Sequence, residues 1–263
     1  MFAQVNGLRL AYGDRGREHE TALLLVHGFP LDRRLWAAQV DPFANMTRVI
    51  SPDLRGHGRS QVVLGPFTME QHGDDLAALL DHLKVRQTVV AGLSMGGYVA
   101  FAFWRRYPKR VRGLILADTR AEPDGAAAQA GRDAAMVTVQ QMGAAAYADE
   151  MLPRLLAPAS QADVKIVGAA RRMMAEQPVE GIVGALGGLR DRADSRPTLS
   201  TISVPTLVIA GEADAITPPA DAQAMAAAIP GARLVVIPRA GHLSPLENPG
   251  AFNAAVRAFL RGL

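Results

Sequence analysis

Hydrophobic and polar positions divide the chain into short apolar runs that alternate with longer segments of mixed character. The apolar runs are "TALLLVHG" at Thr21, "RVISPD" at Arg48, "QTVVAGLS" at Gln87, "GLILADT" at Gly113, "PTLVIAGE" at Pro205 and "RLVVIPRAG" at Arg233. They are apolar on both faces, which is typical of parallel strands buried between two layers of helices. Amphipathic helices are expected over 68–83, 95–107, 218–229 and 249–260. Because a parallel connection must cross over the sheet, this alternation predicts an α/β fold with a doubly wound, mostly parallel sheet.

The start of the chain has a different pattern. In "FAQVNGLRLAY", two short runs of alternating apolar and polar residues are joined by Asn6 and Gly7. Asn-Gly between alternating runs is the strongest short-range signal for a β-hairpin, because both residues accept the positive φ angles of a tight hairpin turn. The sheet is therefore expected to begin with an antiparallel hairpin.

The interval from about Ala121 to Arg196 interrupts the alternation. It contains no convincing strand and is rich in Ala, Met and Arg, and its pieces "AAMVTVQQMGAAAYADEML" and "ADVKIVGAARRMMAEQ" have helical spacing. Prolines at 153, 158 and 178 separate these pieces, because proline disrupts a helix interior. We expect residues 121–196 to form a helical insertion in a core domain built from residues 1–120 and 197–263.

Composition and charge restrict the function further. The chain has 263 residues, of which 49% are hydrophobic and 20% charged, and no apolar run is long enough to span a bilayer. Its first residues lack the pattern of a secretory signal, which makes a cytoplasmic location the default expectation and a membrane partner unexpected. The net charge is only +3, and the arginines are scattered without interleaved aromatics, so nucleic acid is not an expected partner. The absence of cysteine excludes disulfides, thiolate metal sites and a cysteine nucleophile.

A candidate nucleophile lies in "VVAGLSMGGYVAFAF". Gly92, Leu93, Ser94, Met95 and Gly96 match G-x-S-x-G between an apolar strand and a helix. This is the context of a nucleophile elbow, in which a strained turn exposes the serine hydroxyl and small flanking residues relieve crowding. The alternative is a glycine-rich turn of a nucleotide-binding fold, but the order G-L-S-M-G-G does not match the dinucleotide fingerprint G-x-G-x-x-G.

A serine hydroxyl needs a base, and the base needs a group that fixes its tautomer. His242 follows the last apolar strand and Asp214 follows the strand before it, so both would lie at the carboxyl edge of the sheet. The order Ser94, Asp214, His242 agrees with nucleophile, acid and base in α/β hydrolases. Glu212 and Asp118 remain competitors for the acid. The histidines expected to be solvated instead are His19, His72 and His82.

The motifs "HGFP", "DLRGHGRS", "GLSMGG", "GEADAITPP" and "GHLSPLENP" occur in an order that resembles the α/β-hydrolase superfamily, and the resemblance covers nearly the whole chain. The chain is most similar to small hydrolases typified by 3-oxoadipate enol-lactonase and related carboxylesterases. This resemblance implies the α/β-hydrolase fold, with the insertion as a helical cap. It also implies an oxyanion hole made by the backbone N–H groups of Phe29 and Met95. His27 is expected to buttress that loop, and "DLRGHGRS" is expected to be a structural turn.

These observations predict a hydrolase that needs no cofactor and no metal ion and acts on a small-molecule ester or lactone. Ser94, Asp214 and His242 would form a catalytic triad and act through an acyl-enzyme. Two other reactions use the same scaffold: cofactor-free perhydrolysis or halogenation, and carbon–carbon bond hydrolysis. A non-enzymatic alternative is a ligand receptor with slow turnover, because a fold does not determine a function.

Overall fold

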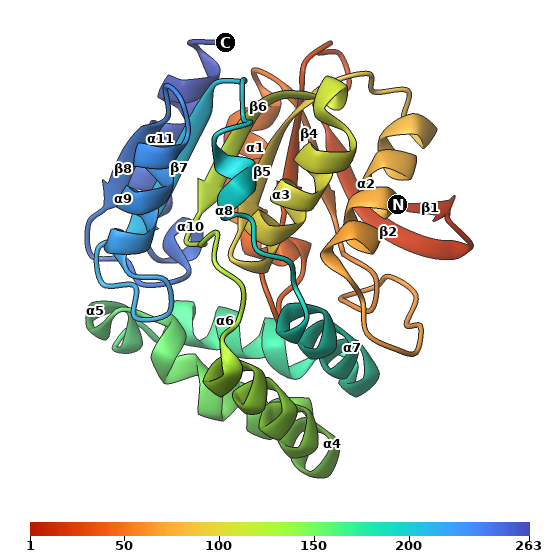
Figure 1. The fold of residues 1–263 in the computed structure, drawn as a ribbon, viewed down its shortest axis with the longest axis vertical. Coiled ribbons are helices and arrows are strands. Elements are labelled where there is room, and N and C mark those ends of the chain that lie inside the picture. Colours follow the sequence, from red (N-terminus) through yellow and green to blue (C-terminus); the bar gives the residue numbers. More distant parts are fainter.

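The computed structural model describes residues 1–263 and contains one eight-stranded sheet (Figure 1). The strands are β1 (Phe2–Val5), β2 (Leu8–Arg15), β3 (Ala22–Val26), β4 (Arg48–Pro52), β5 (Thr88–Leu93), β6 (Val111–Ala117), β7 (Thr206–Gly211) and β8 (Arg233–Ile237). Their order in the sheet is β1-β2-β4-β3-β5-β6-β7-β8. The β1–β2 and β2–β4 pairs are antiparallel and every other pair is parallel. The predicted α/β fold with a mostly parallel sheet is therefore confirmed.

The N-terminal hairpin forms at the predicted turn. Asn6 and Gly7 have φ angles of +47° and +77°, and Val5 pairs with Leu8 across the two-residue loop. Positive φ at both central positions matches the twist of the flanking strands, which explains why Asn and Gly occupy them.

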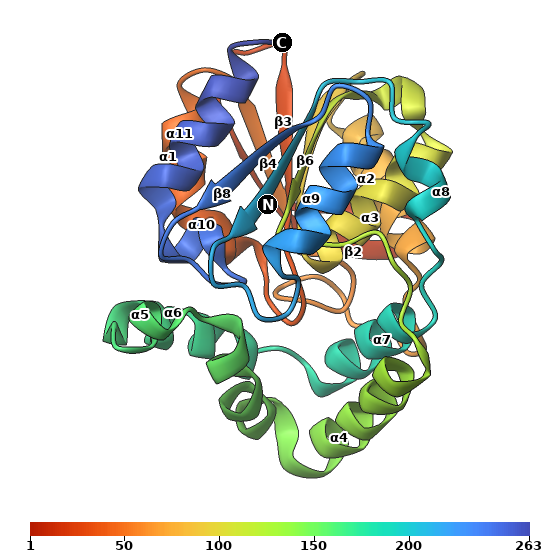
Figure 2. The same ribbon diagram turned by 60° about the vertical axis from the view of Figure 1, so that its left-hand side comes forward.

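Helices cover both faces of the sheet (Figure 2). On one side lie α1 (Ala37–Ala44), α10 (Ser244–Glu247) and α11 (Pro249–Leu260), and on the other lie α2 (Met69–His82), α3 (Met95–Arg106), α8 (Arg196–Leu199) and α9 (Pro219–Ala228). Two short 3₁₀ segments span Arg33–Trp36 and Pro108–Arg110. Successive side chains of a central strand enter opposite cores: Leu24 and Val26 pack on the α3 side, whereas Leu23 and Leu25 pack on the α11 side. This is why both faces of the strand are apolar in the sequence.

The edge strand β8 departs from the prediction of strands buried on both faces. Most of its residues are partly or fully exposed, and Val236 is 40% exposed. The reason is its position, because β8 pairs with β7 alone and has no second neighbour in the sheet. An apolar sequence pattern did not distinguish this edge strand from the central ones.

Residues 121–196 contain no strand, and the helices they form before α8 lie beyond the carboxyl ends of the parallel strands (Figure 2). Their helices are α4 (Ala126–Leu155), α5 (Pro158–Gln161), α6 (Val164–Ala175) and α7 (Val179–Arg190). The run around α4 was expected to be one helical piece, but Gly143 interrupts it with a non-helical φ of +81°. Glycine adopts this angle without steric cost, so the helix changes direction there. None of the helices of the chain is both long and apolar enough to cross a membrane.

The helix α7 packs directly on the core through glycines. A Cβ at Gly188 would overlap the carbonyl oxygen of Phe67, and one at Gly181 would overlap the carbonyl oxygen of Gly56. Backbone-to-backbone contact of this kind is available only where no side chain intervenes. The insertion is therefore seated closely on the loop between β4 and α2.

Candidate active site

Ser94 is the turn residue between β5 and α3. Its φ and ψ angles are +53° and −114°, a combination that side-chain-bearing residues rarely adopt. Neighbouring groups hold this conformation, because the Ser94 N–H donates to the Ala117 carbonyl at 2.9 Å, and the Ser94 carbonyl accepts from the Gly97 N–H at 2.8 Å and the Thr119 hydroxyl at 2.8 Å. The serine side chain makes no capping hydrogen bond to the helix it precedes.

The two glycines that flank Ser94 are required by close packing. A Cβ at Gly92 would overlap the Gly96 carbonyl, and a Cβ at Gly96 would overlap the carbonyl oxygen of Val26 on β3. The strand, turn and helix thus meet as the G-x-S-x-G motif predicts.

A continuous chain of hydrogen bonds connects Ser94, His242 and Asp214. The Ser94 Oγ lies 2.8 Å from His242 Nε2, and His242 Nδ1 lies 2.8 Å from Asp214 Oδ2. The three residues follow β5, β8 and β7 respectively, so the carboxyl ends of three strands supply them. His242 and Asp214 are buried, whereas Ser94 is partly exposed. The structure therefore brings together the three residues that the sequence pattern selected.

Asp214 is held as a carboxylate. Its Oδ1 accepts from the backbone N–H groups of Ile216 at 2.8 Å and Thr217 at 3.0 Å, and its Oδ2 accepts from the Thr217 hydroxyl at 2.7 Å. Burial raises the pKa of Asp214, but hydrogen bonds from His242 and Thr217 outweigh this effect and lower the pKa below its ordinary value. With an anion at Nδ1, that nitrogen carries the proton, and Nε2 is left to accept one from Ser94.

Neither competitor for the acid forms a hydrogen bond with His242. Asp118 is buried and accepts from the Gly211 N–H at 2.7 Å and from the Ser244 hydroxyl at 2.5 Å. Burial and the nearby charge of Asp214 raise the pKa of Asp118 well above its ordinary value. Glu212 instead accepts from the exposed backbone N–H of Arg239 at 3.0 Å. The geometry thus favours Asp214 among the three candidates.

The two N–H groups assigned to the oxyanion hole have no acceptor within the protein. Phe29 and Met95 are buried, and neither backbone N–H donates a hydrogen bond to a protein atom. Gly28 brings the Phe29 loop against the serine, because a Cβ at Gly28 would lie 3.2 Å from the Cβ of Ser94. The Met95 N–H lies in the first turn of α3, where the helix dipole favours negative charge. Buried donors without protein partners beside a serine can bind a developing oxyanion.

His27 supports the loop that carries Phe29. Its Nδ1 lies 2.9 Å from the Gly28 carbonyl, and its Nε2 lies 2.9 Å from the Leu54 N–H. Since a backbone N–H can only donate, Nε2 is the acceptor and Nδ1 carries the proton. Burial lowers the pKa of His27, which keeps the ring neutral. Both ring nitrogens are thus occupied by backbone groups, as expected of a buttress.

The expectation for His72 was wrong. We expected a solvated side chain, but His72 is fully buried and its ring lies 6.1 Å from the Phe67 ring. Neither ring nitrogen has a hydrogen-bond partner. The missed signal is spacing, because His72 lies three residues after Met69 and four before Leu76, both on the buried face of α2.

The turn "DLRGHGRS" has the structural role that was expected. Asp53, the first residue of the turn, accepts from the N–H of Arg59 near its end at 3.0 Å and from the N–H of Arg33 in the first 3₁₀ segment at 2.9 Å, which closes the turn and ties it to that segment. Elsewhere, no three His, Asp or Glu side chains come together as potential metal ligands.

Two residues around the site were missed by the sequence analysis. Thr217 holds the carboxylate of Asp214, and a hydroxyl three residues after an aspartate is a recognisable turn pattern that could have indicated it. Glu247 accepts hydrogen bonds from the backbone on both sides of His242, and no local pattern indicates this contact.

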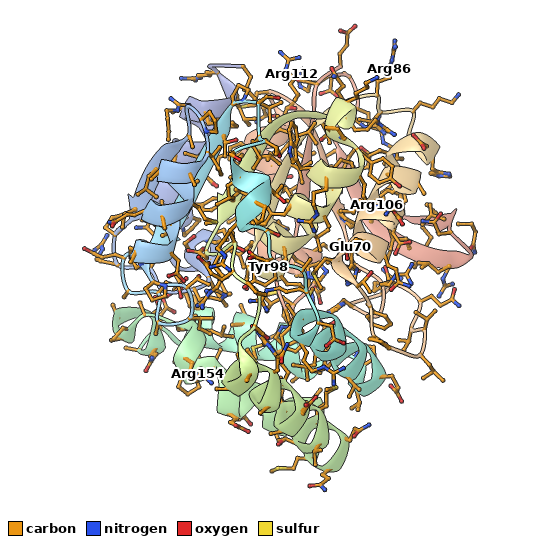
Figure 3. The ribbon with its side chains drawn as sticks, in the orientation of Figure 1. Glu70, Arg86, Tyr98, Arg106, Arg112 and Arg154 are labelled. Carbon is orange, nitrogen blue, oxygen red and sulfur yellow. The ribbon has the colours of Figure 1, made fainter.

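Tyr98, one turn after Ser94, lies where α3 approaches the insertion (Figure 3), with the Arg192 guanidinium carbon 4.4 Å from the centre of its ring.

Comparison with known proteins identifies a family and several similar proteins. The model of the alpha/beta hydrolase fold family matches residues 21–249. 3-Oxoadipate enol-lactonase 2 of Acinetobacter baylyi is 34% identical over 253 residues, which cover 96% of this chain and 93% of that protein. A thermophilic esterase from Thermogutta terrifontis is 44% identical, with a TM-score of 0.95 over 100% of this chain and 98% of that one. The enol-lactonase of Burkholderia xenovorans is 32% identical, with a TM-score of 0.93 over 99% of this chain and 100% of that one.

Proposed function

The chain belongs to the alpha/beta hydrolase fold family, and on that premise we propose that it is a serine hydrolase that cleaves carboxylic esters or lactones through an acyl-enzyme. The observation that carries this proposal is the unbroken hydrogen-bond chain from Ser94 through His242 to Asp214. Relatives that are named as an esterase and as enol-lactonases support the same substrate class.

In the acylation step, His242 Nε2 removes the proton of the Ser94 hydroxyl as Oγ attacks the carbonyl carbon of the substrate. Asp214 holds the imidazole in the required tautomer and stabilises the imidazolium that forms. The imidazolium then gives its proton to the departing alkoxide, which leaves the acyl group on Ser94. A water molecule, deprotonated by the same nitrogen, cleaves the acyl-enzyme and restores the serine.

The backbone N–H groups of Phe29 and Met95 would bind the oxyanion in both steps. Acyl transfer places negative charge on the former carbonyl oxygen, and donors that are fixed in advance stabilise it without reorganisation. One donor of this kind contributes about 3 to 4 kcal/mol of transition-state stabilisation in comparable sites. The buried His27, which binds the Gly28 carbonyl, supports this function by holding the loop in place.

We also propose that residues 121–196 act as a cap over a core formed by residues 1–120 and 197–263. The insertion lies at the carboxyl edge of the sheet, where ligands of α/β folds bind. Tyr147 of α4 approaches Phe29 with 6.3 Å between the ring centres, so the insertion contributes aromatic surface beside the proposed oxyanion loop. In this arrangement the cap would select the acyl group.

The test is the substitution Ser94→Ala. It should leave a folded protein with almost no turnover of p-nitrophenyl acetate or butyrate, because Ser94 carries the hydroxyl that is hydrogen-bonded to His242 Nε2. A fluorophosphonate should label the native protein at Ser94 and leave the variant unlabelled. Turnover of the variant at the native rate would overturn the proposed function, and labelling without turnover of any ester or lactone would favour a receptor.

A further inference from the structure

The loop that carries His242 (residues 238–243, the His242 loop) is fastened to the insertion as well as to the core. The backbone N–H of His242 donates to the carbonyl of Leu155, the last residue of α4, at 2.8 Å. Gly241 packs so closely on the same segment that a Cβ there would lie 2.5 Å from the backbone nitrogen of Ala157. The backbone of the proposed general base thus rests directly on the end of α4.

Glu247 of α10 joins these two segments through one carboxylate. Its Oε1 accepts from the N–H groups of Gly241 at 2.9 Å and Leu243 at 3.0 Å, the residues on either side of His242. Its Oε2 accepts from the N–H of Ala157 in the insertion at 2.8 Å. Hydrogen bonds from backbone N–H groups to a carboxylate are stronger than hydrogen bonds between two neutral groups. All three donors therefore share the carboxylate of a single side chain.

We propose that Glu247 is a positioning residue that sets the orientation of the His242 imidazole by locking the His242 loop to the insertion. The inference rests on the proposed function, because it concerns the same general base. The imidazole must stay within hydrogen-bond reach of Ser94 and Asp214 at once, at 2.8 Å on each side. A displacement of its backbone lengthens at least one of these bonds. Through Glu247, movement of the α4–α5 junction is transmitted to the base.

A second side chain joins the insertion to the core without touching the His242 loop, and it supplies a matched control. Gln177 is buried between α6 and α7, where its Oε1 accepts from the Gly58 N–H at 2.8 Å and its Nε2 donates to Asp32 Oδ2 at 3.0 Å. Its loss should weaken the seating of the insertion on the core and leave the proposed base in place.

The experiment compares Glu247→Gln with Gln177→Leu. The glutamine amide is nearly the same size as the carboxylate, but its NH₂ group must face at least one of the three N–H donors, so one side of the lock is lost. Misplacement of a catalytic group by about 1 Å can cost about 100-fold, so we expect kcat for p-nitrophenyl acetate to fall by about 10- to 100-fold in E247Q. KM should change little. Q177L should lower the melting temperature and leave kcat close to the native value.

A spectroscopic readout separates positioning from a general loss of stability. The proton between His242 Nδ1 and Asp214 should give a downfield proton NMR signal in the native protein. This signal should shift or broaden in E247Q and remain unchanged in Q177L. If E247Q does not fold, Glu247→Asp is the second variant, because it keeps the charge but is too short to reach both segments, and the same loss of kcat is expected.

Native kcat with an unchanged NMR signal in folded E247Q would overturn the inference, and so would native kcat in E247D where E247Q does not fold. An equal loss of kcat in E247Q and Q177L would also overturn it, because the effect would then be a general consequence of loosening the insertion. The inactivity of Ser94→Ala distinguishes these results from failure of the proposed function. An active S94A would defeat both, whereas an inactive S94A with a fully active E247Q would defeat only the role of Glu247.

Discussion

Two buried histidines, His242 and His72, show what separates a candidate catalytic imidazole from a core one. Both are almost completely hidden from solvent, with 2% and 0% of their surface exposed. His242 lies in a loop and bonds to a hydroxyl and a carboxylate, whereas His72 lies on α2 with an aromatic edge beside it and no partner for either nitrogen. Burial alone is therefore no sign of chemistry, and the partners that the fold brings to the ring decide what it can do.

The difference extends to charge. In the proposed mechanism His242 takes the proton of Ser94, and the imidazolium that forms would have the Asp214 carboxylate 2.8 Å away. Burial lowers the pKa of His72 well below its ordinary value, because no counter-charge compensates the lost hydration of the protonated ring. The surroundings of His242 can thus stabilise a transient positive charge on its ring, whereas the surroundings of His72 disfavour a charged ring.

The largest expected effect comes from removing the carboxylate that accompanies His242. In Asp214→Asn, the amide can hold Nδ1 in the wrong tautomer, and the positive charge of the imidazolium has no counter-ion. By analogy with other triads, kcat should fall by roughly 10⁴-fold, as measured with p-nitrophenyl butyrate. Glu212→Gln is the control, and its kcat should stay within about twofold because its carboxylate contacts only an exposed backbone N–H.

Full activity in the Asp214→Asn variant would show that another carboxylate serves His242. Asp118 would then be the first group to examine, because it is buried nearby and its pKa is raised in part by the charge of Asp214.

Acid should destabilise the fold through the buried histidines that have no counter-charge. Burial and the neighbouring His27 lower the pKa of His57 to about 3, and the pKa of His72 is also lowered well below the ordinary value of 6.5. Below about pH 6.5 these histidines bind protons in the unfolded chain but stay neutral in the folded chain, so acid favours unfolding. The contribution of the neutral histidines to the free energy of unfolding is fully present above that pH. It declines towards about pH 3, at up to roughly 1.4 kcal/mol per pH unit for each neutral histidine.

Urea unfolding between about pH 7 and about pH 4.5 measures this decline, a range above the ordinary pKa of most carboxyl groups. The informative quantity is the difference between the native protein and a His72→Leu variant, which should lose stability less steeply. Parallel curves for the two proteins would contradict the assignment of His72 as a buried neutral group.

The smallest effect concerns His72 at neutral pH. In His72→Leu, a side chain of similar size replaces an imidazole whose two nitrogens have lost water without gaining a partner. Removal of such unpaired groups should stabilise the fold by about 1 kcal/mol, which would raise the melting temperature by about 2 to 4 °C. Since His72 takes no part in the hydrogen-bond chain of Ser94, kcat should be unchanged. A lower melting temperature would indicate that the ring has polar partners after all.

How far the sequence could predict the molecule follows from the range of each interaction. The parallel strands and the turn at Ser94 were predictable because apolar runs and a G-x-S-x-G motif encode them locally. The contact of Ser94 with His242 joins residues 148 positions apart, and only their places after strands indicated it.

The features that were missed depend on neighbours distant in sequence. The exposure of β8 follows from its place at the end of the sheet, which its own residues do not encode. The role of Glu247 depends on Ala157, 90 residues away in the insertion. The break in α4 was available in principle, since Gly143 is the residue that tolerates it, but a glycine in a helical pattern is compatible with an unbroken helix too.

The backbone angles of Ser94 imply a trade-off between stability and activity in this chain. A residue with a side chain at φ +53° and ψ −114° costs on the order of 1 to 3 kcal/mol, which glycine would not incur. A glycine at this position would therefore give a more stable and inactive protein. If the serine acts as proposed, the molecule keeps a nucleophile at the expense of part of its folding free energy, and stabilising substitutions elsewhere would be needed to offset it.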